Sequence, residues 1–441
     1  MPASTVRTPP SWPGILLSRE PVRDPLDLEA ARGHGAFEAL RLALTDLGSS
    51  GVIATIAASG LRGRGGAGFP TGEKWRTAAA TPATRRFVVA NGYGADPSSL
   101  TDRTLLERNP YGVLEGALIA ATAIGADEVV VAVRAEATDA IRALETARDR
   151  MLDANLAGFD ILGSGAHIEI TIRSVQGAYM LGEETVLLKA IEGKRGQPEQ
   201  RPPQPATRGL FGYPTVVQNV QTLAAVPWIL VHGAEAFAGV GSKASPGTIL
   251  ASVRAPGGSG VVEVPIGTPL RDIVGLFGKD AAKSLKAYVV GGPSGGILPA
   301  ELGDTAFEFE ALRAVGAHIG SGSIIAADQR ACVVDLARLL TRFCADEACG
   351  KTIPCRIGLR RVSEIGDRIA TGLPKPTDGQ LLADLSSDIV GSALCDHERL
   401  ATLPFASGLR YVRSELDEHI LRSSCPAGVC RPIAVAAGPA H

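Results

Sequence analysis

The stretch GLRGRGGAGFPTGEKW, residues 60–75, is rich in glycine and contains the spacing G-x-G-x-x-G at Gly63, Gly65 and Gly68. Glycine has no side chain, so the backbone N–H groups of such a loop can approach an anion closely. The basic side chains in the stretch are Arg62, Arg64 and Lys74. The loop is therefore a candidate phosphate-binding site, and a tight structural turn between helices is the alternative.

The segment before this loop argues against an ordinary dinucleotide site. Helical patterns cover residues 36–47 and 52–59, and Gly60 stands where a helix C-cap is expected. A Rossmann fingerprint needs a strand before its glycines and a helix after them. Because a helix leads into this loop, the usual nucleotide-binding interpretation fails.

Apolar strands alternate with helices after the loop. The strands are expected at residues 85–91, 128–134 and 167–175, and the helices at 111–125 and 137–158. This alternation is typical of a parallel sheet covered by helices, which binds ligands at the carboxyl ends of its strands. The first strand ends at Asn91, and the third leads into a turn that carries Gly182, Glu183 and Glu184.

The last two fifths of the chain have a different texture. Short strands with Gly/Pro turns begin near Pro246 and indicate a small α+β module of roughly 80 to 90 residues. Helical patterns return near Gln329 and indicate a four-helix bundle. They cover residues 333–343, 357–369, 378–394 and 411–421.

Composition excludes several classes of protein. The 441 residues carry a net charge of -2, so no basic field suits a nucleic-acid backbone. The longest apolar run, 117–126, is shorter than the roughly 18 to 20 residues that span a bilayer, and no secretory signal is recognised. We therefore expect a cytoplasmic protein of two to four domains without direct membrane insertion. G-x-S-x-G, Walker and H-E-x-x-H motifs are absent from the sequence, and His167, His232 and His318 are expected to be satisfied or surface histidines.

All seven cysteines lie in the last quarter of the chain, and their number is odd. In a reducing compartment such cysteines bind a metal or stay free rather than form disulfides. Cys349 and Cys355 lie beside a proline, and Cys395 follows between two helical patterns, which suits an iron–sulfur cluster. A zinc site would favour paired short spacings, and scattered free thiols remain the alternative.

Five motifs in fixed order suggest a family. They are GLRGRGGAGFPTGEKW, GAYMLGEET, EGKRGQP, GLFGYPTVVQNVQTLAAVP and EACGKTIPCR. From about residue 30 to residue 423 the chain resembles the NADH-oxidising flavoprotein subunit of respiratory complex I, which is the 51 kDa or F-type subunit. Relatives of that subunit occur in NAD-linked hydrogenases and formate dehydrogenases.

The resemblance implies a fold and a function. The fold would be α/β, with a Rossmann-like FMN-binding parallel sheet, a β-grasp (SLBB-like) module and a C-terminal four-helix iron–sulfur bundle. The implied units are an N-terminal arm 1–30, the FMN domain 31–242, the β-grasp domain 243–328, the bundle 329–423 and a tail 424–441. The protein would be an NADH dehydrogenase (diaphorase)-like oxidoreductase that passes electrons between NAD(H) and an iron–sulfur chain through FMN. Its partners would be other redox subunits, such as an iron–sulfur or ferredoxin-like protein, in a complex that could be attached to a membrane.

Site residues follow from the resemblance by position. The FMN-binding positions are Gly63, Gly65, Gly66, Lys74, Asn91, Gly182, Glu183, Glu184 and Asn219, with Glu184 as the catalytic residue. The NADH-binding positions are Phe69, Asp96 and Arg201. The cluster ligands are Cys349, Cys355 and Cys395.

Several positions depart from the family pattern. Tyr93 and Gly94 replace two flavin-site carboxylates, and Asp96 replaces a Glu that helps to receive NADH. Thr77 and Gln204 replace phenylalanines that sandwich the dinucleotide, and each lost stacking face could weaken binding by roughly 0.5 to 1.5 kcal/mol. These changes leave open a version of the protein that has the same cofactors but exchanges electrons with a ferredoxin or another protein.

The cluster motif C-G-x-C-x-P-C also departs, because Thr352 occupies the position of the middle cysteine. A hydroxyl is a poor iron ligand, so another thiol completes a four-iron cluster, or the cluster is altered or absent. The thiols available are Cys344 and the pair Cys425 and Cys430 in CPAGVC, which resembles the start of a truncated ferredoxin-like extension. A non-catalytic assembly module of the same fold is the remaining alternative.

Overall fold

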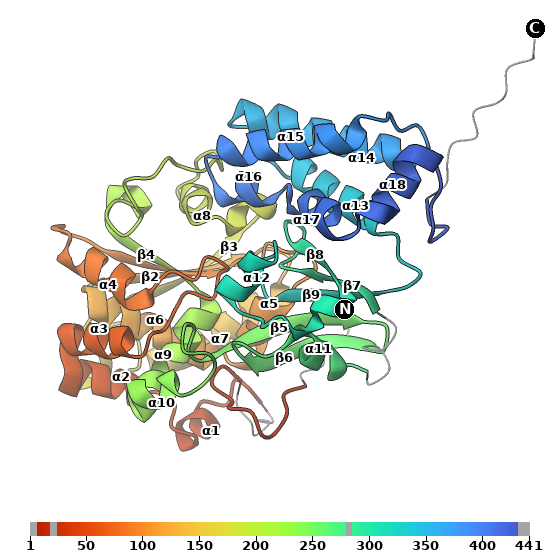
Figure 1. Cartoon of the computed structure of the whole chain (residues 1–441). Helices are drawn as coiled ribbons and strands as arrows, with labels where there is room; N and C mark the ends of the chain where they lie inside the picture. The colour runs from red at the N-terminus through yellow and green to blue at the C-terminus, as the bar shows by residue number, and fades with distance from the viewer. Residues whose placement is uncertain (1–6, 18–23, 279–284, 431–441) are drawn as a thin grey trace, which may run out of the picture.

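The computed structural model describes residues 7–17, 24–278 and 285–430 (Figure 1). The predicted arm 1–30 is therefore described only in part, and the tail 424–441 is described as far as residue 430. Within the described part of the arm, the Glu263 carboxylate accepts hydrogen bonds from the backbone N–H groups of Ile15, Leu16 and Leu17 at 2.8–2.9 Å. The boundaries of the predicted domains remain predictions.

A four-stranded parallel sheet forms the first core. Its strands are β1 (Phe87–Gly92), β2 (Glu128–Arg134), β3 (Glu169–Val175) and β4 (Thr215–Asn219), in the order β3-β2-β1-β4. Alternate residues of β1 face opposite sides: Val88 packs in one apolar cluster and Val89 in the other. Both faces of the sheet are therefore covered, which confirms the predicted helix-covered parallel sheet. The fourth strand, β4, was not predicted.

Helices α6 (Pro110–Ile124), α7 (Thr138–Asp153) and α9 (Val220–His232) cover one face of this sheet, and α8 (Glu184–Ile191) covers the other. Helices α6 and α9 cross closely at Gly116, where a Cβ atom would lie 1.9 Å from the carbonyl oxygen of Leu223. Only glycine fits this crossing. The close contact places the start of α9, and with it the end of β4, firmly against the sheet.

The glycine-rich loop follows a helical run, as the sequence predicted. Helix α2 (Glu38–Leu42), the π-helical turn η1 (Ala43–Leu47) and α3 (Gly48–Ala58) follow one another without a gap, and Gly48 breaks the run with φ +61°. In the described part of the chain this run of 21 residues reaches the length and mean hydropathy, 1.2, of a membrane span. Here Val52 and Ile56 of α3 lie in the apolar core, as they would in the core helix of a globular domain.

The second sheet has five strands in the order β6-β5-β9-β7-β8. They are β5 (Thr248–Ala255), β6 (Gly258–Pro265), β7 (Leu285–Val290), β8 (Gly296–Pro299) and β9 (Ser323–Asp328). Two antiparallel hairpins, β5–β6 and β7–β8, flank the last strand, which runs parallel to β5. This is the strand order of a β-grasp and confirms the predicted module.

Helices return after β9 and form the predicted bundle, which lies over the β7–β8 end of the second sheet (Figure 1). They are α13 (Val333–Asp346), the π-helical η7 (Pro354–Leu359), α14 (Arg360–Ala370), α15 (Asp378–Gly391), the short α16 (Asp396–Leu400), α17 (Leu403–Tyr411) and α18 (Arg413–Arg422). The Ser407 hydroxyl of α17 accepts a hydrogen bond from the Ile297 N–H of β8 at 2.8 Å. The bundle is thus joined to the β-grasp sheet by packing and by a direct bond.

Arg64 fixes the glycine-rich loop to the β-grasp module. Its side chain is 1 % exposed, and its guanidinium donates to the carbonyls of Thr248 at 3.0 Å, Pro246 at 2.5 Å and Arg62 at 2.9 Å. Burial, with the nearby charge of Arg62, lowers the pKa of Arg64 to about 9, so the group is still charged at neutral pH. A buried cation of this kind is costly unless its hydrogen bonds are made, and here carbonyls satisfy it.

We predict that Arg64→Met destabilises the protein by about 2 kcal/mol or more, because buried carbonyls of Pro246 and Thr248 lose their donor. For a domain of this size the loss corresponds to a melting temperature lower by about 4–8 °C in differential scanning calorimetry. Arg173→Met, at an exposed arginine of β3, is the matched control and should leave the melting temperature nearly unchanged. Equal melting temperatures for the two variants would contradict the role given to Arg64.

Candidate functional site

The strand order places a switch point between β1 and β4. The chain moves from β1 outward to β2 and β3, then returns to add β4 on the other side of β1. Asn91 of β1 and Asn219 of β4 are paired in register at the carboxyl ends of the two strands. Open α/β sheets bind ligands at such a point. Two residues predicted at the FMN site are therefore brought together.

Internal bonds hold the two asparagines. Asn219 caps α9 by accepting from the Gln221 N–H at 2.9 Å, and its amide donates to Asp102 at 2.8 Å. Asp102 is buried and its pKa is raised by that burial, although bonds from Gln221 and Asn219 oppose the shift. The Asn91 amide donates to the Gly182 carbonyl at 3.3 Å. Sequence reasoning missed Asp102, for which no motif gave a signal.

The glycine-rich loop lies against the end of β4. A Cβ atom on Gly65 would contact the Cβ of Asn219 at 3.4 Å, and the Arg64 N–H donates to the Thr222 hydroxyl of α9 at 2.8 Å. Within the part of the chain that the structure describes, the next four backbone N–H groups, of residues 65–68, donate no hydrogen bond to protein. Successive unused N–H groups in a loop form an anion-binding concavity. Gly66 needs its glycine, because its φ is +103°.

The positive charge of this loop is distributed differently from the expectation. Arg64 is buried on carbonyls, and Arg62 forms a two-bond ion pair with Glu310, at 2.8 and 3.0 Å, so neither is free to bind a phosphate. Lys74 of α4 (Thr71–Ala80) is the basic group left at the switch point. Its Nζ donates to the Val217 carbonyl of β4 at 3.0 Å.

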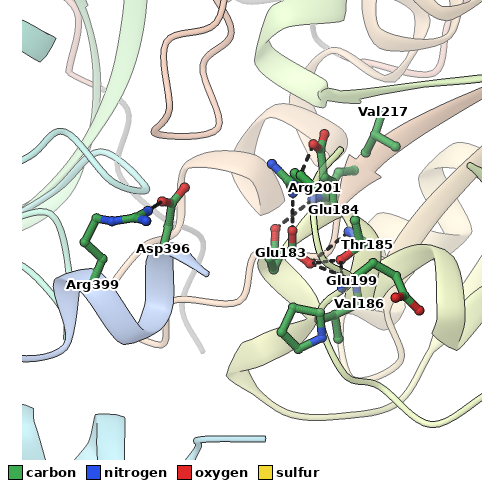
Figure 2. Close-up of polar contacts among 12 residues, drawn as sticks. Glu183, Glu184, Thr185, Val186, Glu199, Arg201, Val217, Asp396 and Arg399 are labelled. Atoms are coloured by element: carbon green, nitrogen blue, oxygen red, sulfur yellow. Dashed lines mark hydrogen bonds and ion pairs between the residues drawn. The ribbon is translucent and has the colours of Figure 1, made fainter. Parts of the chain in front are cut away.

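Two carboxylates and an arginine complete this side of the site (Figure 2). Glu183 caps α8, because one of its oxygens accepts from the N–H groups of Thr185 and Val186, both at 2.9 Å. Glu184 lies 3.1 Å from Lys74 Nζ and 3.1 Å from the Arg201 guanidinium, which also pairs with Glu183. Lys74, Glu183, Glu184 and Arg201, all predicted site residues, therefore form one ion-pair network.

The residues predicted to receive NADH are less uniform. Phe69 is 50 % exposed and lies 5.9 Å from Lys74 Nζ, so its ring is available at the site. Asp96 is 5 % exposed, and its carboxylate accepts from the Ser98 N–H at 2.8 Å and from the Ser321 hydroxyl. Its oxygens are therefore used to join the first domain to the β-grasp module. The role of Asp96 in binding NADH remains a prediction.

Tyr93, which stands where the family has a flavin-site Asp, is turned into the core. Its side chain is 1 % exposed, and its hydroxyl donates to the Gly177 carbonyl at 2.6 Å. The ring packs with Val89 and Leu181, between the sheet and the segment that leads into α8. The substitution therefore exchanges a polar group for core packing.

The three predicted cluster ligands lie where the bundle meets the first domain. Cys349 and Cys395 are partly buried against the apolar cluster that contains Leu181, and Cys355 is 4 % exposed. Burial raises the pKa of Cys355 to about 12, and the charges of Cys395 and Cys349 act in the same direction. Burial likewise raises the pKa of Cys395 to about 11, to which Cys349 contributes. A bound cation would stabilise these thiolates.

Thr352 does not stand free at the missing position. Its hydroxyl donates at 2.7 Å to Glu398, which is 1 % exposed and also accepts from the Leu394 N–H at 2.8 Å. Sequence reasoning missed Glu398, whose charge is felt by Cys355. Cys344, one of the thiols suggested as a replacement ligand, is buried close enough to Cys355 for their charges to interact.

Cys425 and Cys430, the other suggested replacements, are gathered elsewhere. Their sulfurs lie with Cys332 Sγ and a ring nitrogen of His419, and all four atoms are within 4.8 Å of one another. In the part of the chain that the structure describes, this is the group of potential metal ligands that comes so close together. Neither Cys332 nor His419 was singled out by the sequence, because 87 positions separate them.

Comparison with known proteins agrees with this geometry. Residues 56–228 match the Nuo51 FMN-binding domain, and residues 335–419 match the NADH-ubiquinone oxidoreductase-F iron-sulfur binding region. The glycine loop and all four strands of the first sheet lie within the first match, and the three cluster cysteines lie within the second. The residues present thus fit both cofactors, with Thr352 as the departure.

Whole-chain relatives point the same way. The NADP-reducing hydrogenase subunit HndC of Solidesulfovibrio fructosivorans is 39% identical over 92% of this chain and 82% of its own length. The second F-type subunit of the NADH-quinone oxidoreductase of Rhizobium meliloti is 36% identical over 93% of this chain and 99% of its own. A crystal structure of an NAD+-reducing [NiFe]-hydrogenase matches 95% of this chain and 68% of its own, with a TM-score of 0.81 and 30% identity. The chain therefore belongs to the family of F-type subunits of NADH-quinone oxidoreductase and their hydrogenase relatives.

Proposed function

We propose that this chain is the flavin-bearing electron-transfer subunit of a larger redox complex and exchanges electrons between NAD(H) and an iron–sulfur chain. The observation that carries the proposal is the run of unused backbone N–H groups at residues 65–68, which lies beside Asn219 at the switch point of the sheet. A site of this kind receives an anionic group of a bound cofactor. FMN, which takes a hydride and releases single electrons, supplies the chemistry.

The residues that would hold FMN form a continuous surface. The loop amides and Lys74 face an anion, whereas Asn91 and Gly182, already joined by a hydrogen bond, lie at the end of β1. The other assigned positions are Gly63, Gly65, Gly66, Glu183, Glu184 and Asn219. Glu183 keeps the start of α8 in place by capping it, so that the adjacent Glu184 and Lys74 hold a fixed position. We assign the catalytic role to Glu184, because Lys74 and Arg201 both contact it.

NAD(H) is the proposed substrate, with Phe69, Asp96 and Arg201 as its contacts. Phe69 offers an exposed ring face, and Arg201 offers a cation 34 % exposed at its side chain. Thr77 contributes no ring, since its hydroxyl is bonded to the Glu73 carbonyl of its own helix at 2.9 Å. This loss favours exchange with a ferredoxin-like protein as the second candidate. Both versions place the protein in the cytoplasm with other redox subunits.

We predict that anaerobic NADH bleaches the visible flavin absorbance of the purified protein. Glu184→Gln should slow the bleaching about tenfold or more, because the carboxylate between Lys74 and Arg201 is lost. Glu235→Gln, at an exposed carboxylate of α10 (Ala234–Ala238), should react like the wild type. Stopped-flow absorbance measures both rates.

The outcomes of this experiment separate the candidates. Flavin that dithionite reduces and NADH does not would end the NAD(H) version in favour of the ferredoxin version. A protein without flavin or iron would leave only the assembly module.

An iron–sulfur cluster on Cys349, Cys355 and Cys395 is the proposed outlet. Three thiolates hold iron less firmly than four, so we predict that Thr352→Cys, which replaces a hydroxyl by a thiol, raises iron retention. Thr377→Cys, at an exposed threonine before α15, adds a thiol away from the site and should have no effect. Iron and sulfide per chain, with electron paramagnetic resonance of the reduced protein, provide the readout. Equal iron contents in both variants would show that another ligand already completes the cluster.

A further inference from the structure

Four potential metal ligands converge at the far side of the bundle, apart from the predicted cluster set. Cys332 is the N-cap residue of α13, His419 lies in the last turns of α18, and Cys425 and Cys430 lie in the loop that follows. Cys332 and His419 are each 2 % exposed, and the two loop cysteines are partly buried. All four ligand atoms lie within 4.8 Å of one another.

The distances fit one ion rather than a cluster. Cys332 Sγ lies 3.6 Å from Cys430 Sγ and 3.4 Å from His419 Nε2. A tetrahedral zinc with Zn–S near 2.3 Å and Zn–N near 2.0–2.1 Å has S–S edges of about 3.8 Å and S–N edges of about 3.6 Å. A four-iron cube spreads its ligand sulfurs farther apart, because each cysteine binds a different iron.

The surroundings prepare these atoms as ligands. His419 Nδ1 lies 2.7 Å from the Glu415 carbonyl, so this nitrogen carries the proton and Nε2 presents its lone pair to the sulfurs. Backbone N–H groups donate to two of the sulfurs, from Asp335 to Cys332 at 3.4 Å and from Cys430 to Cys425 at 3.5 Å. A carbonyl that fixes the imidazole tautomer is the usual outer partner of a metal-bound histidine.

We propose that Cys332, His419, Cys425 and Cys430 bind one Zn²⁺ in a closed, four-coordinate structural site. Three thiolates and one imidazole fill the tetrahedron and leave no position for a substrate, which is the mark of a structural zinc site. The proposal stands on these residues alone and does not depend on flavin, NAD(H) or the predicted cluster.

The position of the site gives it a role. Cys332 follows β9 of the β-grasp sheet by four residues and begins the first helix of the bundle, whereas the other ligands end the last helix. Glu415 of α18 reinforces the same junction, because it accepts from the Val333 N–H at 3.0 Å and pairs with Lys286 of β7 at 2.6 Å. The ion would close the bundle and tie the end of α18 to the sheet.

Metal analysis of the whole purified chain tests the proposal. We expect about one zinc per chain in addition to iron, and an X-ray absorption spectrum at the zinc edge with three sulfur and one nitrogen neighbours. In Cys425→Ser and His419→Gln, zinc should fall to near zero while FMN content stays unchanged. Cys349→Ser is the matched control: it should lose iron and keep its zinc.

Wild-type measurements keep the test decisive where a variant fails to fold. Zinc released from the native protein on titration of its thiols with a mercurial reagent should leave with about three thiols. Zinc absent from the wild type, a single iron in its place, or a Cys332–Cys430 disulfide found by mass spectrometry would each overturn the proposal. Loss of iron from Cys425→Ser in place of zinc would instead assign this thiol to the cluster.

Discussion

The whole site depends on a glycine-rich loop that is held rigidly while its own N–H groups stay unused. The buried Arg64 guanidinium anchors it to carbonyls of the β-grasp module, and Thr222 anchors it to α9. Since the loop contacts both domains, the β-grasp module is part of the flavin site's support rather than an appendage. A loop satisfied by its own hydrogen bonds would have no amide to offer a cofactor, and a loop without anchors would have to be ordered by it.

The contact between the first domain and the bundle has the same character. The Tyr179 N–H donates to Glu347 of the bundle at 2.7 Å, and Lys351 donates to the Pro198 carbonyl at 2.6 Å. Glu183, which caps α8 beside the flavin site, is close enough to Cys395 to contribute to its raised pKa. The proposed entry and exit points for electrons therefore share one short segment around α8, and no long path between them is needed.

Much of the fold could be predicted from sequence, because apolar strands alternate with helices and the loop plainly follows a helix. Strand β4 escaped prediction because its five residues follow turn-forming glycine and proline. Site chemistry was harder, since partners lie far apart in the chain. Arg64 looked like a phosphate ligand until its acceptor at Thr248, 184 positions away, was known. His419 gave no signal at all without Cys332 beside it.

The flavin content of the protein tests the central claim most directly. Purified, denatured wild-type protein should release about one FMN per chain, since the loop amides, Lys74 and the two asparagines form one preorganised site. A colourless protein that contains no FMN and takes up none from solution would contradict the account, because the unused N–H groups of residues 65–68 would then have no cofactor to bind.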